Sequence, residues 1–517
     1  MKLVACLLGL FFSVSGFGQH LILTPYSDSR DLARLRTSAS VAIHYIGNDF
    51  ILATTSTEWP VGSIHLKANP WNPDISYFLV WLPEANRQEA VTLLQEHYSV
   101  LYSDNTKAIV EIPGTQPIPK PFVHGGIVRI SQKSQFIPEI PEDTRYVIDT
   151  FPLIYTLMAM VDTGEFMPDI RFLEAYGTRY CESLQALQAQ EWIKEQFEQY
   201  PGLEVEVQNF PYYGGSSSDN VIATLPGKLH PEEYVAIGAH YDSYSWSGNA
   251  PGADDNASGT AAVLELARIL SQFEWDRSII FCTFSAEEVG LVGSEYYASH
   301  AQAQGMDILG YFNFDMIGYH YWSDQIHTDM IAPPSALELV NFYKDVAAIY
   351  LPDFGVFDAQ LTGGDSDHTS FNNNGYMGIF PFEDVPHYSP YIHTPQDLVG
   401  PSMNSPEMAA TFIQANLASV GSLSVPYDPV GVKDPLQQEL TIHLYPNPAT
   451  EDLTIVARGN ELIDITIFSQ LGQPVIRRTI NGQATIDVST LSAGAYFVQA
   501  SSGHQHSYAR LMVGPSR

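Results

Sequence analysis

The 517-residue sequence predicts an α/β protein whose main part is a mixed, mostly parallel sheet with helices on both faces, together with a small N-terminal α/β region and a C-terminal all-β sandwich. Three observations predict this architecture. Long apolar runs alternate with helical stretches between about residues 150 and 425, shorter strand-like runs come before residue 145, and short alternating strands follow residue 438. A hydrophobic content of 45% is enough for several cores in a chain of this length.

The first 18 residues read as a secretory signal peptide. One lysine precedes an apolar stretch from Leu3 to Val14, and a small-x-small "GFG" ends at Gly18. Because this apolar run is too short for a membrane span, we expect cleavage near Gly18 and no transmembrane segment in the mature chain. Residues 19–145 hold the runs "VAIHYIG", "DFILATT", "YFLVWLP" and "AIVEIP" and one helical stretch, residues 85–98, and they contain no ionisable cluster. We interpret them as an accessory or pro-region.

The segment 146–425 carries the candidate functional residues. Its apolar runs are "EYVAIGA", "SIIFCTF", "ILGYFNF" and "GYMGIFPF", and Cys282 inside the second run is expected to be a small buried hydrophobe. The helical stretch 258–273 places Val263, Leu266, Ala267 and Leu270 on one face. In open α/β sheets, ligands bind beyond the carboxyl ends of the strands. Polar side chains follow all four runs at those ends: His240 and Asp242, Glu287 and Glu288, Asp315, and Glu383 with Asp384.

Residues 426–437 contain three prolines and few apolar side chains, which indicates a linker. The segment 438–517 then alternates short strands with turns such as Asn481-Gly482, a pattern typical of a small β-sandwich. The whole chain has 58 acidic and 24 basic residues, a formal charge of −34. Such an excess of negative charge argues against nucleic acid or an anionic membrane surface as a partner.

Two histidines and three carboxylates in the segment 146–425 form a candidate metal-binding set: His240, Asp255, Glu288, Asp315 and His393. These donors suit zinc, with manganese or cobalt as substitutes. Five ligands are too many for one zinc ion that keeps an open position, but they fit two ions that share a bridging carboxylate. In such a site one of the adjacent glutamates binds metal and its neighbour acts on the water that the metals activate.

Five ordered motifs, "GAHYDS", "PGADDNASG", "FSAEEVGLVGSEYY", "NFDMIG" and "YIHTPQD", closely resemble those of the secreted two-zinc aminopeptidases, metallopeptidase family twenty-eight. The resemblance covers about residues 150–425 and implies a zinc exopeptidase-like fold. It also implies two Zn²⁺ ions per chain, one bound by His240 and Asp315 and the other by Glu288 and His393, with Asp255 as the bridge.

The same resemblance implies that Glu287 is the general base and that Asp242 lies beside the metal-binding histidine. The family places its bridging acid four residues before the glycine of "DDNASG", which favours Asp255 over Asp254. The motif "IHTPQD" favours the later of two candidate histidines, since His387 has no counterpart in the family.

The segment "GGDSDHTSF" also resembles part of this family, and it suggests that Asp367 and His368 orient substrate. A purely structural role for this loop stands as an equal alternative.

The tail resembles a second known domain. "LYPNPATEDLTI", "ITIFSQLGQPV", "IDVSTLSAGAYFVQ" and "ARLMV" look like the C-terminal sorting domain of the bacterial type IX secretion system. This implies the secretion machinery as a partner and export to the medium or the cell surface, whereas a carbohydrate-binding β-sandwich is the alternative.

Together these features predict an exported di-zinc aminopeptidase that hydrolyses N-terminal residues from peptide substrates. The alternatives are a glutaminyl cyclase of the same fold, a carboxypeptidase or dipeptidase of the same clan, and a non-catalytic cell-surface binding protein that has lost a ligand or the base.

Overall fold

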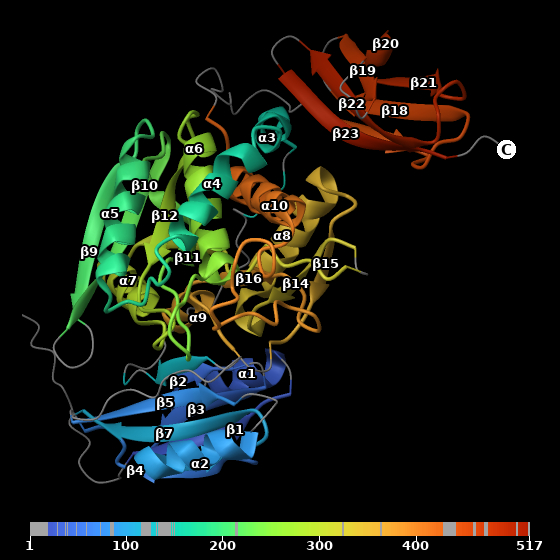
Figure 1. Cartoon of the computed structure of the whole chain (residues 1–517). Helices are drawn as coiled ribbons and strands as arrows, with labels where there is room; N and C mark the ends of the chain where they lie inside the picture. The colour runs from blue at the N-terminus through green and yellow to red at the C-terminus, as the bar shows by residue number, and fades with distance from the viewer. Residues whose placement is uncertain are drawn as a thin grey trace, which may run out of the picture. The chain divides into compact units, whose positions relative to one another are not determined.

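A computed structural model describes residues 19–514 with gaps, and the chain divides into two compact units, residues 1–427 and 428–517 (Figure 1). The longest gaps are 115–125, 133–145 and 428–440, and shorter ones lie at 28, 37, 39, 48, 58, 73, 83–86, 131, 147, 149, 212–215, 323–324, 362–363, 459–461, 470–473 and 503–504. The predicted signal peptide and most of the predicted linker lie outside the described residues.

The centre of the first unit is an eight-stranded mixed sheet with the strand order β15-β14-β16-β13-β11-β12-β10-β9. Its inner strands β16, β13, β11 and β12 run parallel to one another, whereas the pairs β14–β16, β10–β12 and β9–β10 are antiparallel. The strands are β9 (Glu204–Pro211), β10 (Ser217–Leu225), β11 (His230–His240), β12 (Arg277–Phe284), β13 (Asp307–Asn313), β14 (His327–Ile331), β15 (Gly355–Asp358) and β16 (Gly378–Phe382). The mixed sheet predicted from the sequence is confirmed.

Helices pack on both faces of this sheet (Figure 1). They are α3 (Pro152–Met158), α4 (Thr163–Glu174), α5 (Leu184–Glu198), α6 (Gly259–Leu270), α7 (Val292–Gln304), α8 (Leu337–Tyr350), α9 (His368–Asn373) and α10 (Pro406–Ser424), with the short turns η2 (Ala253–Ser258) and η3 (Pro334–Ala336). Side chains of a strand point alternately to the two faces. In β12, Ile279 and Phe281 therefore join the core with α5, α6 and α10, whereas Ile280 and Cys282 join the core with α7 and α9.

Helix α6 is more deeply buried than its amphipathic pattern predicts. The predicted face of Val263, Leu266, Ala267 and Leu270 is fully buried, but so is most of the opposite face. The reason is that α6 contacts β11 and β12 on one side and α4, α5 and α10 on the other.

The N-terminal region consists of two modules with the same topology. The first contains β1 (His20–Pro25), α1 (Ser29–Arg36), β2 (Val41–Ile46), β3 (Phe50–Thr55) and β4 (Ile64–Ala68), and the second contains β5 (Ile75–Trp81), α2 (Arg87–His97), β6 (Ser99–Ser103), β7 (Lys107–Pro113) and β8 (Ile127–Ile130). Their sheets have the orders β2-β3-β1-β4 and β6-β7-β5-β8, which are equivalent, and all the pairs are antiparallel. The sequence predicted strands and a helix here but not this internal repeat.

The N-terminal modules contact two loops of the larger sheet. Leu291 is buried in the hydrophobic cluster that contains Tyr45, Phe50 and Trp81. The Tyr45 hydroxyl donates a hydrogen bond of 2.8 Å to Asp365 Oδ2. One loop follows Glu287 and Glu288, so the accessory region supports a segment that carries candidate site residues.

The second unit contains strands only among its described residues. They are β17 (Thr441–Tyr445), β18 (Asp452–Arg458), β19 (Ile463–Ser469), β20 (Pro474–Ile480), β21 (Gln483–Asp487), β22 (Gly494–Ser502) and β23 (Gln505–Val513). The sheets β17-β18-β21 and β20-β19-β22-β23 share one hydrophobic cluster, in agreement with the predicted β-sandwich. Across the described parts of both units, no helix combines the length and the apolar character that spanning a membrane requires.

Candidate metal centre and active site

Three neighbouring parallel strands bring candidate residues to one edge of the large sheet. β11 ends at His240, the loop after β12 carries Glu287 and Glu288, and Asp315 follows β13 by two residues. Because β12, β11 and β13 are adjacent and parallel, the carboxyl ends of all three strands lie at the same edge. The structure thus brings the polar residues that follow these three strands to one edge of the sheet.

A tight turn before α6 adds Asp255 to this edge. Gly252 has a φ of +58°, and a Cβ atom there would lie 2.5 Å from the carbonyl oxygen of Asp255, so the turn requires glycine. The carboxylate of Asp397 accepts hydrogen bonds of 2.9 Å and 3.1 Å from the backbone N–H groups of Asp254 and Asp255. The Asp397 carboxylate therefore holds the backbone of this turn at Asp254 and Asp255.

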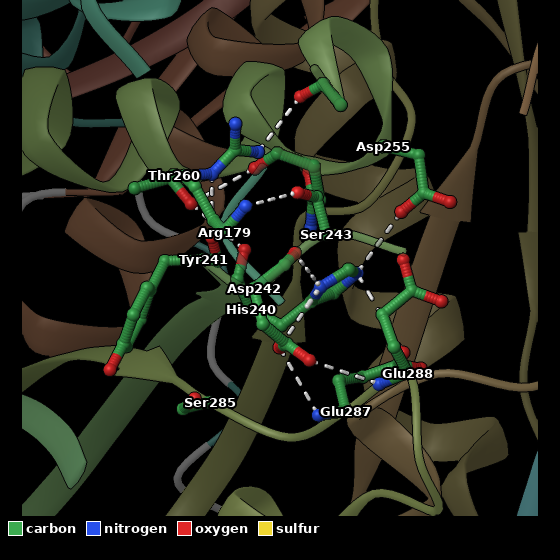
Figure 2. A network of polar contacts seen from close by, with 12 residues as sticks. Arg179, His240, Tyr241, Asp242, Ser243, Asp255, Thr260, Ser285, Glu287 and Glu288 are labelled. Carbon is green, nitrogen blue, oxygen red and sulfur yellow. Dashed lines mark hydrogen bonds and ion pairs between the residues drawn. The ribbon is translucent and has the colours of Figure 1, made fainter. Parts of the chain in front are cut away.

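The two oxygens of Asp255 face different histidines. Oδ1 lies 3.4 Å from His240 Nε2, and Oδ2 lies 3.3 Å from His393 Nε2. His240 Nε2 also lies 3.5 Å from Asp315 Oδ1, while His393 Nε2 lies 2.8 Å from Glu288 Oε2. The five predicted ligands thus form two groups around one shared carboxylate, and Figure 2 shows three of them, His240, Asp255 and Glu288.

Asp242 connects the histidine and glutamate segments (Figure 2). Its Oδ1 accepts a 3.2 Å hydrogen bond from the Glu287 N–H, and its Oδ2 accepts a 3.4 Å bond from the Glu288 N–H. The Asp242 carbonyl lies 3.1 Å from His240 Nδ1. Since a carbonyl can only accept, Nδ1 carries a hydrogen, and Nε2 is the ring nitrogen that faces the carboxylates.

The electrostatics of this edge call for a cation. Burial alone would lower the pKa of His240, but Glu287 and Asp315 outweigh burial and raise that pKa well above its ordinary value. The pKa of His393 is raised in the same way, chiefly by Glu288 against the effect of burial. Burial, reinforced by Asp255, raises the pKa of Glu288 to about 7. A divalent ion would remove the cause of these shifts, which is unbalanced negative charge.

Orphaned polar atoms support the same conclusion. Glu288 Oε1, Asp315 Oδ1 and His393 Nδ1 are buried and have no hydrogen-bond partner among the residues that the structure describes. Unsatisfied buried polar atoms are costly and uncommon in folded proteins, so each needs an explanation. Metal coordination explains the two carboxylate oxygens, and the donor set of imidazoles and carboxylates fits zinc. The residues present therefore fit the implied metal ions.

Glu287 lies beside the two groups, and its contact with His240 is longer than those of Asp255 and Asp315. It is only 9% exposed, and its Oε2 is 4.0 Å from His240 Nε2. Burial raises the pKa of Glu287 well above its ordinary value, His240 opposes this, and the charges of Glu288 and Asp367 add to the rise. Glu287 is thus a buried carboxyl group with an elevated affinity for a proton.

Asp367 and His368, the two residues predicted to orient substrate, differ in their surroundings. Burial raises the pKa of Asp367 to about 7, and the charge of His240 acts on this carboxyl group. His368 instead lines a small cavity with Tyr45 and Trp81, and burial lowers its pKa to about 3. Of these two residues, Asp367 is the one whose charge interacts with His240 and Glu287 of the candidate centre.

Asp254 and His387, which the sequence disfavoured as metal ligands, have other partners. Asp254 Oδ1 accepts a 2.9 Å hydrogen bond from the Gly318 N–H, and Asp254 shares a hydrogen bond with Glu383. His387 Nδ1 lies 3.1 Å from Asp384 Oδ2. Glu383 and Asp384 also follow a strand, but among the described residues neither joins a cluster with His240, and Asp384 lies instead with His327 and Asp329.

Sequence reasoning missed Arg179, which is fully buried beside the centre (Figure 2). Its guanidinium donates hydrogen bonds to the carbonyls of Tyr241 (2.7 Å), Leu173 (3.0 Å), Pro251 (2.6 Å) and Gly252 (2.9 Å). It thereby joins the segment after β11 to the turn before Asp255. A single arginine far from the motifs gives no sequence signal for this role.

Two further supporting residues were also missed. Asp397 closes "YIHTPQD" but was not considered as the acceptor for the turn, and Ser366 Oγ donates a 2.7 Å hydrogen bond to Asp315 Oδ2. The position of Asp397 inside a recognised motif was the only available signal.

Comparisons with known proteins identify the family. Residues 220–415 match Peptidase family M28. The chain is 32% identical to "Leucine aminopeptidase 1" of Neurospora crassa over 291 residues, which cover 52% of this chain and 68% of the relative. The chain belongs to peptidase family M28. This M28 peptidase is also 29% identical to "Leucine aminopeptidase 1" of Phaeosphaeria nodorum over 294 residues, covering 52% of this chain and 72% of that protein.

Solved structures share the fold of this M28 peptidase. Legionella pneumophila LapB has a TM-score of 0.56 at 21% identity, and the Legionella pneumophila LapA aminopeptidase has a TM-score of 0.55 at 19% identity. These matches cover 68% and 69% of this chain and 100% of the Legionella chains. Residues 443–514 match the secretion system C-terminal sorting domain, as the tail motifs predicted.

Proposed function

We propose that this M28 peptidase is an exported aminopeptidase that removes N-terminal residues from peptides and holds two Zn²⁺ ions per chain. The observation that carries the proposal is the orientation of Asp255, whose two oxygens face His240 and His393 separately. A carboxylate in this position suits a bridge between two ions. The relatives named leucine aminopeptidase support the choice of substrate end.

Each ion would have its own ligands beside the shared Asp255. His240 and Asp315 would hold one ion, and Glu288 and His393 would hold the other. When bound, the ions would lower the pKa of a water molecule and polarise the scissile carbonyl. The hydrogen bond from His240 Nδ1 to the Asp242 carbonyl keeps Nε2 available as a ligand.

Glu287 is the proposed general base. Its carboxylate accepts a proton from the attacking water and returns that proton to the leaving amine. Burial and neighbouring carboxylates raise its pKa, which strengthens it as a proton acceptor. Asp242 positions this base through the Glu287 N–H and therefore acts on the reaction indirectly.

Negative charge near the reaction site suits a substrate with a free α-amine. Glu287, Glu288, Asp315 and Asp367 are all buried at this edge. A protonated amine would gain from these carboxylates, whereas a blocked N-terminus would not. This provides a physical reason for exopeptidase activity at the amino end.

The experiment that tests the proposal compares Glu287→Gln with Glu288→Gln. We expect Glu287→Gln to keep the wild-type metal content and to lose roughly 10²- to 10⁴-fold in turnover, because only the proton acceptor is removed. We expect Glu288→Gln to lose metal as well as activity. The matched control is Glu232→Gln, whose carboxylate is exposed. Near-normal turnover of Glu287→Gln would refute the assignment of the base.

A further inference from the structure

A second set of metal-binding side chains lies outside the proposed catalytic centre. His327 begins β14, Asp329 follows it on the same strand, and Asp384 lies just after β16. β14 and β16 pair in antiparallel register, with Asp329 opposite Phe382. One nitrogen of His327 and one oxygen from each aspartate lie within 4.8 Å of one another. The two aspartates are each 7% exposed.

The hydrogen bonding of His327 determines which ring nitrogen faces the aspartates with a lone pair. Its Nδ1 lies 2.8 Å from the carbonyl oxygen of Gln325, which can only accept, so Nδ1 carries the hydrogen. Nε2 is then the nitrogen that faces Asp329 Oδ1 at 3.9 Å and Asp384 Oδ1 at 4.0 Å, and it offers them a lone pair when it carries no proton. Both distances are too long for hydrogen bonds.

The other oxygens of both aspartates are already held. Asp329 Oδ2 accepts a 2.9 Å hydrogen bond from the Val385 N–H, and Asp384 Oδ2 lies 3.1 Å from His387 Nδ1. Each of the three candidate ligands is therefore oriented by a hydrogen bond through its second polar atom. This is the arrangement that orients ligands in natural metal sites.

Three electron-pair donors thus face one point, and two of them are carboxylates. Ligand atoms at about 2.0 to 2.1 Å from a tetrahedral zinc lie roughly 3.3 Å apart, so a small contraction of the observed distances would complete the geometry. A surface cavity of about 470 Å³, lined by His327, Asp384 and His387, gives an ion access from solvent. We propose that His327, Asp329 and Asp384 bind one divalent transition-metal ion such as Zn²⁺, separate from the two catalytic ions.

The site has the remaining features that a metal site needs. His327 retains 20% side-chain exposure, which leaves room for water as a fourth ligand. An ion here would cross-link β14 to the segment after β16, which continues toward His393. The competing explanation is a protonated His327 paired with both aspartates, and that explanation predicts no metal uptake.

The test uses the full secreted chain, stripped by a chelator, dialysed against Zn²⁺ and analysed for metal content. We expect His327→Gln and Asp384→Asn each to bind one zinc per chain fewer than the wild type, and His327→Gln to keep wild-type peptidase turnover. His230→Gln is the matched control, because His230 lies 3.8 Å from Glu232 at an exposed position and, among the described residues, belongs to no cluster of three possible metal ligands.

Equal zinc content in the wild type and His327→Gln would overturn the proposal, and so would an equal loss in His230→Gln, which would indicate non-specific surface binding. An independent measurement needs no variant: anomalous scattering from zinc-soaked wild-type crystals should show a peak between His327 Nε2 and the two aspartate oxygens. Absence of that peak, with peaks present at the catalytic centre, would also refute the site. None of these outcomes depends on the proposed aminopeptidase activity.

Discussion

Replacing Arg179 by methionine should destabilise the first unit and weaken metal binding together. The guanidinium donates four hydrogen bonds to backbone carbonyls. At about 1.5 kcal/mol each, the low end for bonds from a charged group, these bonds contribute about 6 kcal/mol. Burial lowers the pKa of Arg179 to about 10 from its ordinary 12.5, which corresponds to a cost of roughly 3 kcal/mol at 1.36 kcal/mol per pKa unit. The free energy of unfolding should therefore fall by about 3 kcal/mol in Arg179→Met.

Calorimetry of the metal-loaded protein measures this loss. An unfolding entropy of about 2.1 cal/mol/K per residue gives about 0.8 kcal/mol/K for some 400 residues, so the Tm of the first unit should fall by roughly 3 to 4 °C. Metal content should fall as well, because Arg179 holds the carbonyls of Tyr241 and Gly252 on either side of the centre. Arg34→Met is the control, since Arg34 is 78% exposed in its pair with Asp31. A shift below 1 °C with unchanged metal content would refute this account of Arg179.

Three further predictions concern Asp365, Leu291 and the C-terminal segment 438–517. Burial raises the pKa of Asp365 from its ordinary 3.8 to about 6. The unfolded chain therefore loses this proton near pH 4 and the folded protein near pH 6, so the wild type should lose roughly 3 kcal/mol of stability relative to Asp365→Asn as the pH rises through this window, about 2 kcal/mol of it between pH 4 and pH 6. A pH-independent difference in urea unfolding would contradict this. Leu291→Ala should lower the free energy of unfolding by about 2 to 5 kcal/mol and should also lower turnover, because Leu291 anchors the loop after Glu287 and Glu288 in the N-terminal hydrophobic cluster. Unchanged stability and kinetics would show that this contact does not support the loop. Removal of residues 438–517 should leave the activity of purified protein intact and abolish its secretion, whereas an inactive truncated enzyme would contradict the proposed domain boundary.

The candidate centre was largely predictable because its chemistry follows the ends of recognisable strands. His240, Glu288 and Asp315 come after long apolar runs, and a parallel sheet necessarily brings such positions to one edge. Asp255 and His393 were predicted from motif resemblance, and the structure turns both toward the same place. Strong periodicity and ordered motifs carried this part of the prediction.

Residues that act through the backbone left no comparable signal. Arg179 and Asp397 bind backbone carbonyl and N–H groups. Because almost every residue has these groups, the sequence does not show which residues are the partners. The cluster of His327, Asp329 and Asp384 could not be predicted from the sequence either. It forms because β14 pairs antiparallel with β16 in a mostly parallel region of the sheet. His387, which the motif comparison set aside in favour of His393, contacts Asp384.

The N-terminal duplication was missed for a related reason. β4 and β6 are short and mostly solvent-accessible, so their sequences "IHLKA" and "SVLYS" show little apolar patterning. Antiparallel pairing with the more apolar β1 and β7 determines their structure. Tertiary context therefore overrides weak local preference at such edges.

Hydrolysis of a substrate panel by protein that lacks the signal peptide and the tail tests the proposed aminopeptidase activity. The panel contains aminoacyl substrates with a free amine, the same substrates with a blocked amine, and peptides with N-terminal glutamine, each assayed before metal removal, after it, and after zinc is restored. The account predicts cleavage of free-amine substrates only, lost on metal removal and regained with zinc. Equal cleavage of blocked substrates, ammonia release from N-terminal glutamine without peptide hydrolysis, or no turnover in any zinc-restored sample would contradict it.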